Sequence, residues 1–436
     1  MTDTPTKRTP LFPLCVMMFL QYAIWGAWLP LLWPFLHGHR GLTPSQIGDM
    51  FAVGALGAIL APFIAGQIAD RYFSTERFLG ISHILGGVLI WQLGSLDSYW
   101  GFFWFSFAYS VIYAPTLSLT NSLAFHHLED RDRDFGKVRV WGTVGWIVVG
   151  ITIGQWLLHR HTPATGSAVE IQQAQWAGMA DAFRLSAILG IIMGCYCFFL
   201  PHTPSSKGKQ KSATLEAMSE VRRNPLLTLF LLAVPISCIH QFYFVHTAGF
   251  LGEFQSAAAM KINQVFGVGG GGLMTIGQMS EVLVLALIPM VAKKVSRKSL
   301  LALGIIGYAL RMLLFAYVEP ISAATGIAPV AILLVGVAMH GLCFGCFIFV
   351  AFMIVDEETA ADVRASAQSL FNLVIVGIGI IVGSKIAGWA ANWATVDGQM
   401  DYTKLFSVPM WGALACLLIL LLFYPRISPR RGAGVA

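Results

Sequence analysis

Long apolar segments separated by short polar loops repeat along the whole chain of 436 residues. A predominantly apolar run of about 20 residues is long enough to cross a bilayer as a helix. The pattern therefore predicts twelve membrane-spanning helices, joined by loops on the two sides of the membrane. Their expected positions are 11–35, 45–70, 77–96, 99–125, 137–158, 182–201, 225–252, 266–292, 298–318, 325–354, 364–391 and 403–424.

The longest polar stretch, "HTPSSKGKQKSATLEAMSEVRRNP", lies between the sixth and seventh predicted spans. It divides the chain into two parts with six spans each. We therefore expect an all-α membrane protein with an N-terminal half (1–201), a cytoplasmic linker (202–224), a C-terminal half (225–425) and a cytoplasmic tail (426–436).

Composition and charge support this class and give an orientation. Hydrophobic residues make up 56% of the chain and charged residues only 11%, against about 25% charged in soluble domains. The basic residues gather in alternate loops, and the opposite loops hold only Arg40, Arg160, Lys261 and Lys404. Because cytoplasmic loops carry the excess of Lys and Arg, both termini should be cytoplasmic. The net charge of +6 is explained by orientation, so no nucleic-acid partner is expected.

A short motif follows the second predicted span. The segment "GQIADRYFSTER" (66–77) has a glycine, then an Asp-Arg pair four residues later, then a further basic residue. With two six-span halves and a basic central loop, it resembles the major facilitator superfamily, whose halves rock about a site near the bilayer midplane. Gly66 would allow close helix approach, and Asp70 and Arg71 would form a gating latch between helix ends.

A carboxylate inside an apolar span is the most informative residue in the chain. Glu281 lies near the middle of the eighth span, and Gln278 precedes it by three positions, so both point the same way. Ionisable groups are expensive in the bilayer and are functional candidates by default. The open alternatives for Glu281 are a structural hydrogen bond between helices, or a group that binds a polar solute, carries a proton, or does both.

Further polar groups lie at membrane depth. Arg139, Thr143 and Trp146 share one face of the fifth span, which suits a planar, hydrogen-bonding solute. Arg139 is also close to the cytoplasmic end, where an arginine can extend to the interface. The remaining groups are Gln21, His83, Asn121, His240, Gln241, His246, Arg311, His340 and Lys385.

Some of these polar groups have simpler explanations. His83 is expected to make a hydrogen bond between helices. Lys385 is expected to extend to the outer interface, and Arg311 has no partner visible in the sequence. The spacing of Gln21, Trp25 and Trp28 along the first span indicates a face that can stack and hydrogen-bond.

At these positions the sequence resembles the nucleoside:proton symporter family. The motifs that carry the resemblance are, in chain order, "FLQYAIWGAW" (19–28), "APTLSLTNS" (114–122), "RVWGTVGW" (139–146), "GQMSE" (277–281) and "VRASAQSLF" (363–371). The resemblance implies a major facilitator fold and proton-coupled import of nucleosides without a bound cofactor. It also implies a solute site made of Arg139, Thr143, Trp146, Gln241, Gln278, Glu281 and Phe344.

The sequence departs from the family pattern at three positions. Phe244 stands where an Asn is usual, His340 where a Tyr is common, and Gly345 where a carboxylate usually follows Phe344. Because that carboxylate is missing, Glu281 is the main candidate for the coupled proton. His240, His246 and His340 are the next groups to consider.

We therefore expect a secondary active transporter, working as a monomer, that imports nucleosides with protons by alternating access. The alternatives are transport of a sugar or another nucleoside-like solute, uniport without protons, a membrane-embedded enzyme, and a transporter-like sensor. No catalytic constellation is evident, so an enzyme is not expected. Cys343 and Cys346 have a CxxC spacing but lack the second pair of a zinc site, so no metal is expected.

Overall fold

The computed structural model describes residues 10–64, 74–204, 221–254, 257–359 and 364–425. These residues are almost entirely helical. Within this part of the chain, ten helical segments are long and apolar enough to cross a membrane. Helices α3 (Pro44–Ile64) and α5 (Thr75–Leu93), at the second and third predicted spans, are not among the ten, so the count of twelve stays a prediction. The motif residues Gly66, Asp70 and Arg71 lie outside the described residues.

The N-terminal half begins with one long helical segment that is longer than predicted. It continues from α1 (Leu11–Trp28) to His39 through a 3-10 turn and a π-helical turn. The elements of this half are α1, η1 (Leu29–Leu31), α2 (Leu32–Pro34), η2 (Phe35–His39), α3, α5, α6 (Tyr99–His127), α7 (Arg131–Arg160), α8 (Ala168–Gly178) and α9 (Ala180–Cys197).

The C-terminal half also contains π-helical turns, which lie in the tenth and eleventh predicted spans of the chain. Its elements are α11 (Leu226–Gly252), α12 (Ala257–Phe266), α13 (Gly271–Val291), α14 (Arg297–Ala316), α15 (Val318–Thr325), α16 (Pro329–Ala338), α17 (His340–Cys343), η4 (Phe344–Phe349), α18 (Val350–Glu358), α19 (Arg364–Asn372), η5 (Leu373–Gly379), α20 (Ile380–Ala394), β1 (Thr395–Val396), β2 (Gln399–Met400) and α21 (Tyr402–Phe423). The short helices α8, α12 and α15 were not predicted as separate elements.

Local sequence signals set several helix ends. The Ser98 hydroxyl accepts a hydrogen bond from the backbone N–H of Gly101 at the start of α6. At α8, Ser167 and Glu170 form a reciprocal capping box, which satisfies two backbone donors that the first turn leaves free. Asp401 caps α21 with a single side-chain hydrogen bond, because its carboxylate accepts from the backbone N–H of Lys404.

The glycine run before Glu281 lies at the start of its helix. We expected this span to begin at residue 266. Instead, Gly267, Gly269 and Gly270 have φ angles of +82°, +87° and +79°, and α13 begins at Gly271. Such φ values are left-handed and incompatible with a continuing right-handed helix. The glycines therefore form the turn that leads into α13.

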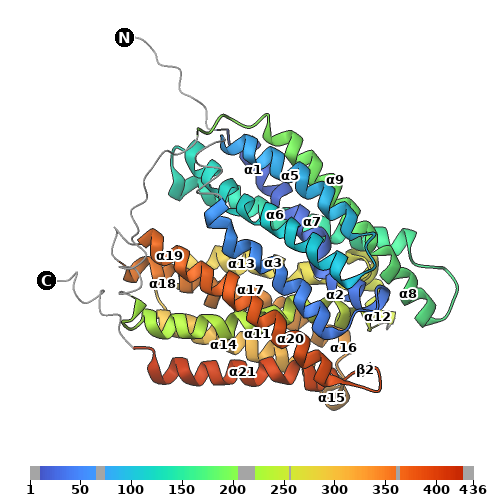
Figure 1. Ribbon diagram of the computed structural model, residues 1–436. Helices are drawn as coiled ribbons and strands as arrows, with labels where there is room; N and C mark the ends of the chain where they lie inside the picture. Colours follow the sequence, from blue (N-terminus) through green and yellow to red (C-terminus); the bar gives the residue numbers. More distant parts are fainter. Residues whose placement is uncertain (1–9, 65–73, 205–220, 255–256, 360–363, 426–436) are drawn as a thin grey trace, which may run out of the picture.

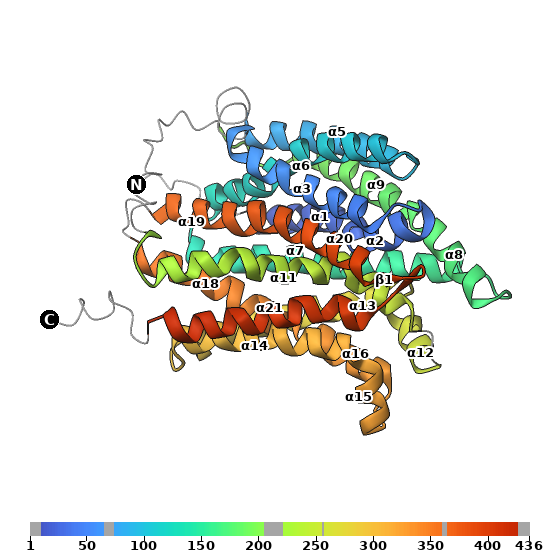
Figure 2. The same ribbon diagram turned by 60° about the horizontal axis from the view of Figure 1, so that its bottom comes forward.

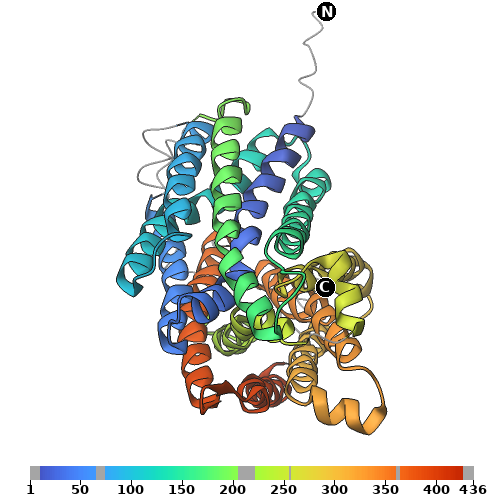
Figure 3. The same ribbon diagram turned by 90° about the vertical axis from the view of Figure 1, so that its right-hand side faces the viewer.

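The two halves form two helical bundles that lie side by side. In Figure 1 the blue-to-green helices of the N-terminal half lie above the yellow-to-red helices of the C-terminal half. In the view turned by 60° (Figure 2), α20 of the C-terminal half lies alongside α3 of the N-terminal half. Helices α8, α12 and α15 lie at one end of the molecule, which we call the α8 end, and α18 and α19 lie at the other. Figure 3 looks onto the α8 end.

The halves contact each other along α3 with α20 and along α7 with α13. Close approach depends on glycine: a Cβ atom at Gly48 would lie 2.7 Å from the Ser384 carbonyl oxygen, and one at Gly388 would lie 2.7 Å from that of Pro44. Next to this contact, the Lys385 ammonium group pairs with the Asp49 carboxylate. The Lys385 side chain is 58% exposed, and its ion-pair partner, 336 residues away in sequence, was not predicted.

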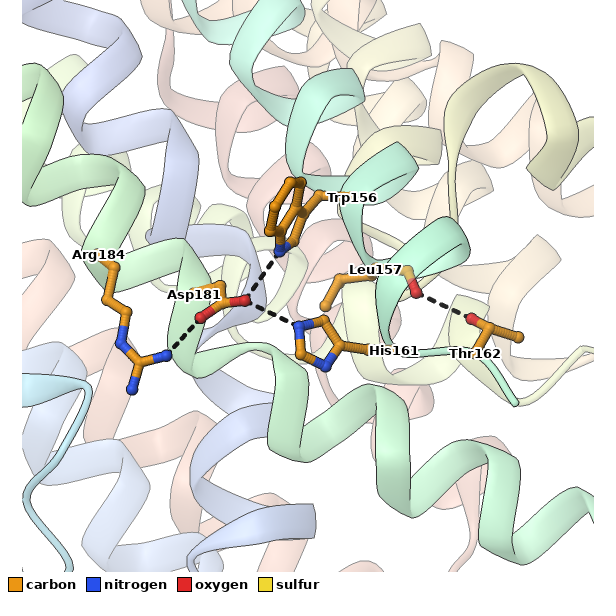
Figure 4. A network of polar contacts seen from close by, with 6 residues as sticks. All are labelled: Trp156, Leu157, His161, Thr162, Asp181 and Arg184. Carbon is orange, nitrogen blue, oxygen red and sulfur yellow. Dashed lines mark hydrogen bonds and ion pairs between the residues drawn. The ribbon is translucent and has the colours of Figure 1, made fainter. Parts of the chain in front are cut away.

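Polar contacts also hold α7 in place near the α8 end of the molecule. Figure 4 shows the Asp181 carboxylate of α9 accepting hydrogen bonds from Trp156 Nε1 and His161 Nε2, each at 2.8 Å, and from Arg184 at 2.6 Å. The residue before Trp156, Gln155, donates from its Nε2 to the Gln264 carbonyl oxygen of α12 at 2.8 Å. These contacts tie α7 to its own half and to the other half at the α8 end.

Candidate functional site

Helix α7 contributes one wall of the candidate site. Arg139, Thr143 and Trp146 lie on its partly exposed face, as the spacing predicted. The Arg139 guanidinium lies over the ring of Tyr22, 4.1 Å from its centroid.

Helix α13 contributes the opposite wall. Gln278 is 5% exposed, and its Oε1 has no hydrogen-bond partner in the described structure. The Glu281 side chain is 15% exposed, and its Oε2 lies 3.5 Å from Nε2 of His340. A buried acceptor without a partner is uncommon and needs an explanation. At this position a hydrogen bond from a bound solute would provide one.

Aromatic rings connect the two walls. Trp146 packs edge-on against Trp25 of its own half, with ring centroids 6.1 Å apart, and against Phe244 of the other half at 6.3 Å. Phe344 begins the π-helical turn η4. Its ring is 6.4 Å from that of His340. Single π-helical turns are frequent at functional sites.

Gln241 is the predicted site residue that the structure separates from the others. Gln241 is 5% exposed, and a Cβ atom added at Gly383 of α20 would lie 3.0 Å from the Cβ of Gln241. It therefore packs toward α20, while His240 and Phe244 of the same helix lie against His340. No hydrogen bond joins Gln241 to another predicted site residue in the described part of the chain.

Residues that the sequence could not assign surround Glu281. Arg311 of α14 is 0% exposed and reaches Nδ1 of His340 at 3.2 Å. Its guanidinium lies over the rings of Tyr243 at 4.3 Å and Tyr308 at 5.2 Å. The signal in the sequence was the presence of Arg311, His240 and His340 at membrane depth. Their mutual contacts were not predictable, because α11, α14 and α17 meet only in the folded chain.

The arrangement combines the chemical features that a polar, ring-shaped solute needs. Arg139 supplies a cation from one half, and Gln278 and Glu281 supply acceptors from the other. Trp146 and Phe344 supply aromatic surfaces. A solute between α7 and α13 would contact both halves, so its binding would depend on how the halves are placed relative to each other.

Comparison with known proteins gives a consistent result. The family model described as nucleoside H+ symporter matches residues 10–428. The chain is 33% identical over 383 residues to the putative nucleoside transporter YegT of Escherichia coli (strain K12), covering 86% of this chain and 83% of the relative. It is 27% identical over 427 residues to the xanthosine permease of the same organism, covering 94% of both chains.

The fold also matches a solved structure. The crystal structure of the nucleoside transporter NupG aligns with a TM-score of 0.79 at 22% identity, covering 94% of this chain and 98% of that chain. At this identity the likeness shows the fold alone. The expected major facilitator fold is therefore confirmed. The family and the fold are those of transporters, so the alternative of a membrane-embedded enzyme is excluded.

Proposed function

The chain belongs to the nucleoside H+ symporter family, and from this premise we propose that Glu281 takes up the coupled proton beside a nucleoside held between α7 and α13. The protein is a secondary active transporter whose coupling ion is the proton, and it needs no cofactor. The observation that carries the assignment is the unpartnered, buried Oε1 of Gln278, one turn before Glu281 on the helix that packs against α7 of the other half.

The nucleoside contacts follow from the chemistry of the walls. Gln278 accepts a hydrogen bond from the solute, which satisfies its unpartnered Oε1. Arg139 and Thr143 contact the solute from α7, and Trp146 and Phe344 pack against the base or the sugar. Gln241 acts on this site only if α11 or α20 moves, because it packs toward α20 in the described state.

The test is Glu281→Gln, assayed in proteoliposomes with labelled uridine, adenosine and xanthosine. The amide keeps the shape of the protonated carboxyl group but cannot release a proton. Accumulation driven by a pH gradient should therefore disappear, while exchange of internal for external nucleoside should persist. Mutant vesicles that still concentrate a nucleoside against its gradient would show that the proton travels through another group.

The division and orientation of the chain are part of the proposal. The halves 1–201 and 225–425 rock as two units about the site, and the basic linker 202–224 and both termini are cytoplasmic in a bacterial inner membrane. The asymmetry of Lys and Arg between the two sets of loops supports this orientation. The protein acts as a monomer, which light scattering of the purified protein would test against the chain mass of 47.5 kDa.

Cysteine labelling tests the orientation. In a variant without the native cysteines, Thr395→Cys at the start of the β1–β2 hairpin should react with a membrane-impermeant thiol reagent in whole cells. Ser205→Cys, in the linker, should stay unlabelled until the membrane is opened. The reverse pattern would contradict the orientation.

A further inference from the structure

The C-terminal half contains a fully buried cation, Arg311, that is only partly paired. One of its terminal nitrogens contacts His340 Nδ1 at 3.2 Å, but its Nε and Nη2 have no hydrogen-bond partner in the described structure. Two tyrosine rings cover the guanidinium. A buried charge is costly unless something compensates it, so the position of Arg311 calls for a role beyond packing.

The contact with Arg311 determines the state of the His340 imidazole. An arginine side chain can only donate hydrogen bonds, so Nδ1 of His340 must be the acceptor. The single ring proton of a neutral imidazole then sits on Nε2, the atom that lies 3.5 Å from Glu281 Oε2. A second proton on Nδ1 would break the contact and place two positive charges side by side.

Small residues bring His340 to Glu281. A Cβ atom at Gly341 would lie 2.4 Å from the Ser280 carbonyl oxygen, and one at Gly345 would lie 2.7 Å from Val284 Cγ1. Two glycines four positions apart allow two membrane helices to approach closely, here α13 and the α17–η4 segment. Gly345 therefore has a positive role: α13 occupies the space that a side chain at this position would need.

We propose that Arg311 and His340 are a positioning pair for Glu281. Arg311 keeps the imidazole neutral and directs its Nε2–H toward Glu281, and this donor stabilises the ionised carboxylate without carrying a proton itself. The inference rests on the proposed role of Glu281. When a proton binds to a Glu281 oxygen, the carboxylate loses the negative charge that offsets the buried positive charge of Arg311. Release of that proton restores this negative charge and is therefore favoured.

The groups around His340 are consistent with an imidazole that stays neutral and positions Glu281. From α11, His240 and Tyr243 stack on the imidazole at 5.3 and 4.7 Å. From α14, Tyr308 hydrogen-bonds to His240 at 2.7 Å. From α17 itself, the buried Cys343 thiol follows one turn later. Among the described residues, Glu281 is the only carboxylate in contact with the Arg311–His340 pair.

The test measures how nucleoside uptake depends on external pH in proteoliposomes, with whichever of labelled uridine, adenosine or xanthosine the wild-type protein accumulates fastest. His340→Leu removes the donor, so the ionised form of Glu281 loses stabilisation and Glu281 holds its proton to higher pH. The pH of half-maximal uptake should rise by up to about one unit, because the 3.5 Å contact is longer than an ordinary hydrogen bond to a charged group. Arg311→Met should move the same midpoint.

The conservative variant His340→Gln distinguishes a side chain that only positions Glu281 from one that carries the proton itself. In His340→Gln the amide oxygen can accept from Arg311 and the amide nitrogen can donate to Glu281, but the side chain cannot titrate. It should restore the wild-type pH midpoint and keep proton-driven accumulation. The control is His83→Gln, because His83 is a similarly buried histidine in the other half, 2.9 Å from Gln21. It should leave the pH profile unchanged.

The outcomes are distinguishable from a failure of the proposed function. If Glu281→Gln abolishes proton-driven accumulation but His340→Leu and Arg311→Met leave the pH midpoint unmoved, the positioning pair is refuted and the role of Glu281 stands. If His340→Gln loses proton-driven accumulation, the imidazole carries the proton itself. Exchange activity measured beside uptake identifies variants that fail to fold. If Arg311→Met is one of them, His340→Gln and His340→Leu alone decide between these outcomes.

Discussion

Two buried glutamines, one in each half, differ in how their hydrogen-bonding groups are used. Gln21 of α1 is 0% exposed, donates to Thr116 Oγ1 at 2.9 Å and has Nε2 of His83 at 2.9 Å from its Oε1. Gln278 of α13 is 5% exposed, and its Oε1 has no partner among the described residues. The same side chain at similar burial is therefore satisfied in one half and left open in the other.

The difference indicates separate roles for the two polar clusters. The cluster around Gln21 joins α1, α5 and α6 within one bundle, and the hydroxyl of Tyr113 adds a hydrogen bond to the Gln21 backbone oxygen at 2.5 Å. The cluster around Gln278 leaves the Tyr243 hydroxyl and two Arg311 nitrogens without partners as well. Satisfied networks stabilise a unique fold, whereas the open Gln278 acceptor beside a carboxylate can pair with a ligand. We expect the first cluster to govern stability and the second to govern binding.

The larger effect should come from Gln21→Ala. Removing the amide leaves the buried Nε2 of His83 without a partner and opens a cavity, so the free energy of unfolding should fall by about 2–4 kcal/mol. The measurement is thermal or denaturant unfolding of the purified protein. Nucleoside affinity of the folded fraction should stay at the wild-type value, and a large loss of affinity without a loss of stability would contradict the comparison.

The smaller effect should come from Gln278→Ala, and in a different quantity. Loss of the acceptor leaves a solute donor unpaired, which costs about 1–3 kcal/mol, or roughly a tenfold loss of affinity. Because Oε1 has no partner in the described structure, the free energy of unfolding should fall less than in Gln21→Ala, by the cavity contribution alone. Calorimetric titration with nucleoside, beside the same unfolding assay, measures both quantities. Wild-type affinity in this variant would show that Gln278 does not contact the solute.

Several site residues were predictable from the sequence for clear physical reasons. A carboxylate in an apolar run stands out, so Glu281 was visible, and the helical period placed Gln278 on the same face. The period likewise placed Arg139, Thr143 and Trp146 together on α7. The hydrogen bond of His83 to another helix was also predicted and is confirmed, with Gln21 as the partner. The first span's stacking and hydrogen-bonding face was only partly correct, because the Gln21 amide is used inside its own bundle.

Other features needed the folded chain. The contact of Arg311 with His340 joins residues 29 positions apart on different helices, and the pair of Lys385 with Asp49 joins residues 336 positions apart. Gln241 shares α11 with His240 but faces α20. The periodicity of one helix cannot say which neighbour covers each of its faces.

The sequence by itself determined the class of this protein: apolar runs of bilayer length, a polar stretch between two halves, and a few polar groups at depth follow from the cost of exposing the wrong group to lipid. Only the tertiary structure decided which of those polar groups meet. Their partners depend on helix packing, and glycines at positions such as Gly48, Gly341 and Gly388 set how closely the helices approach. That close approach brings His340 to Glu281 and Lys385 to Asp49, at distances where charge and hydrogen bonding act.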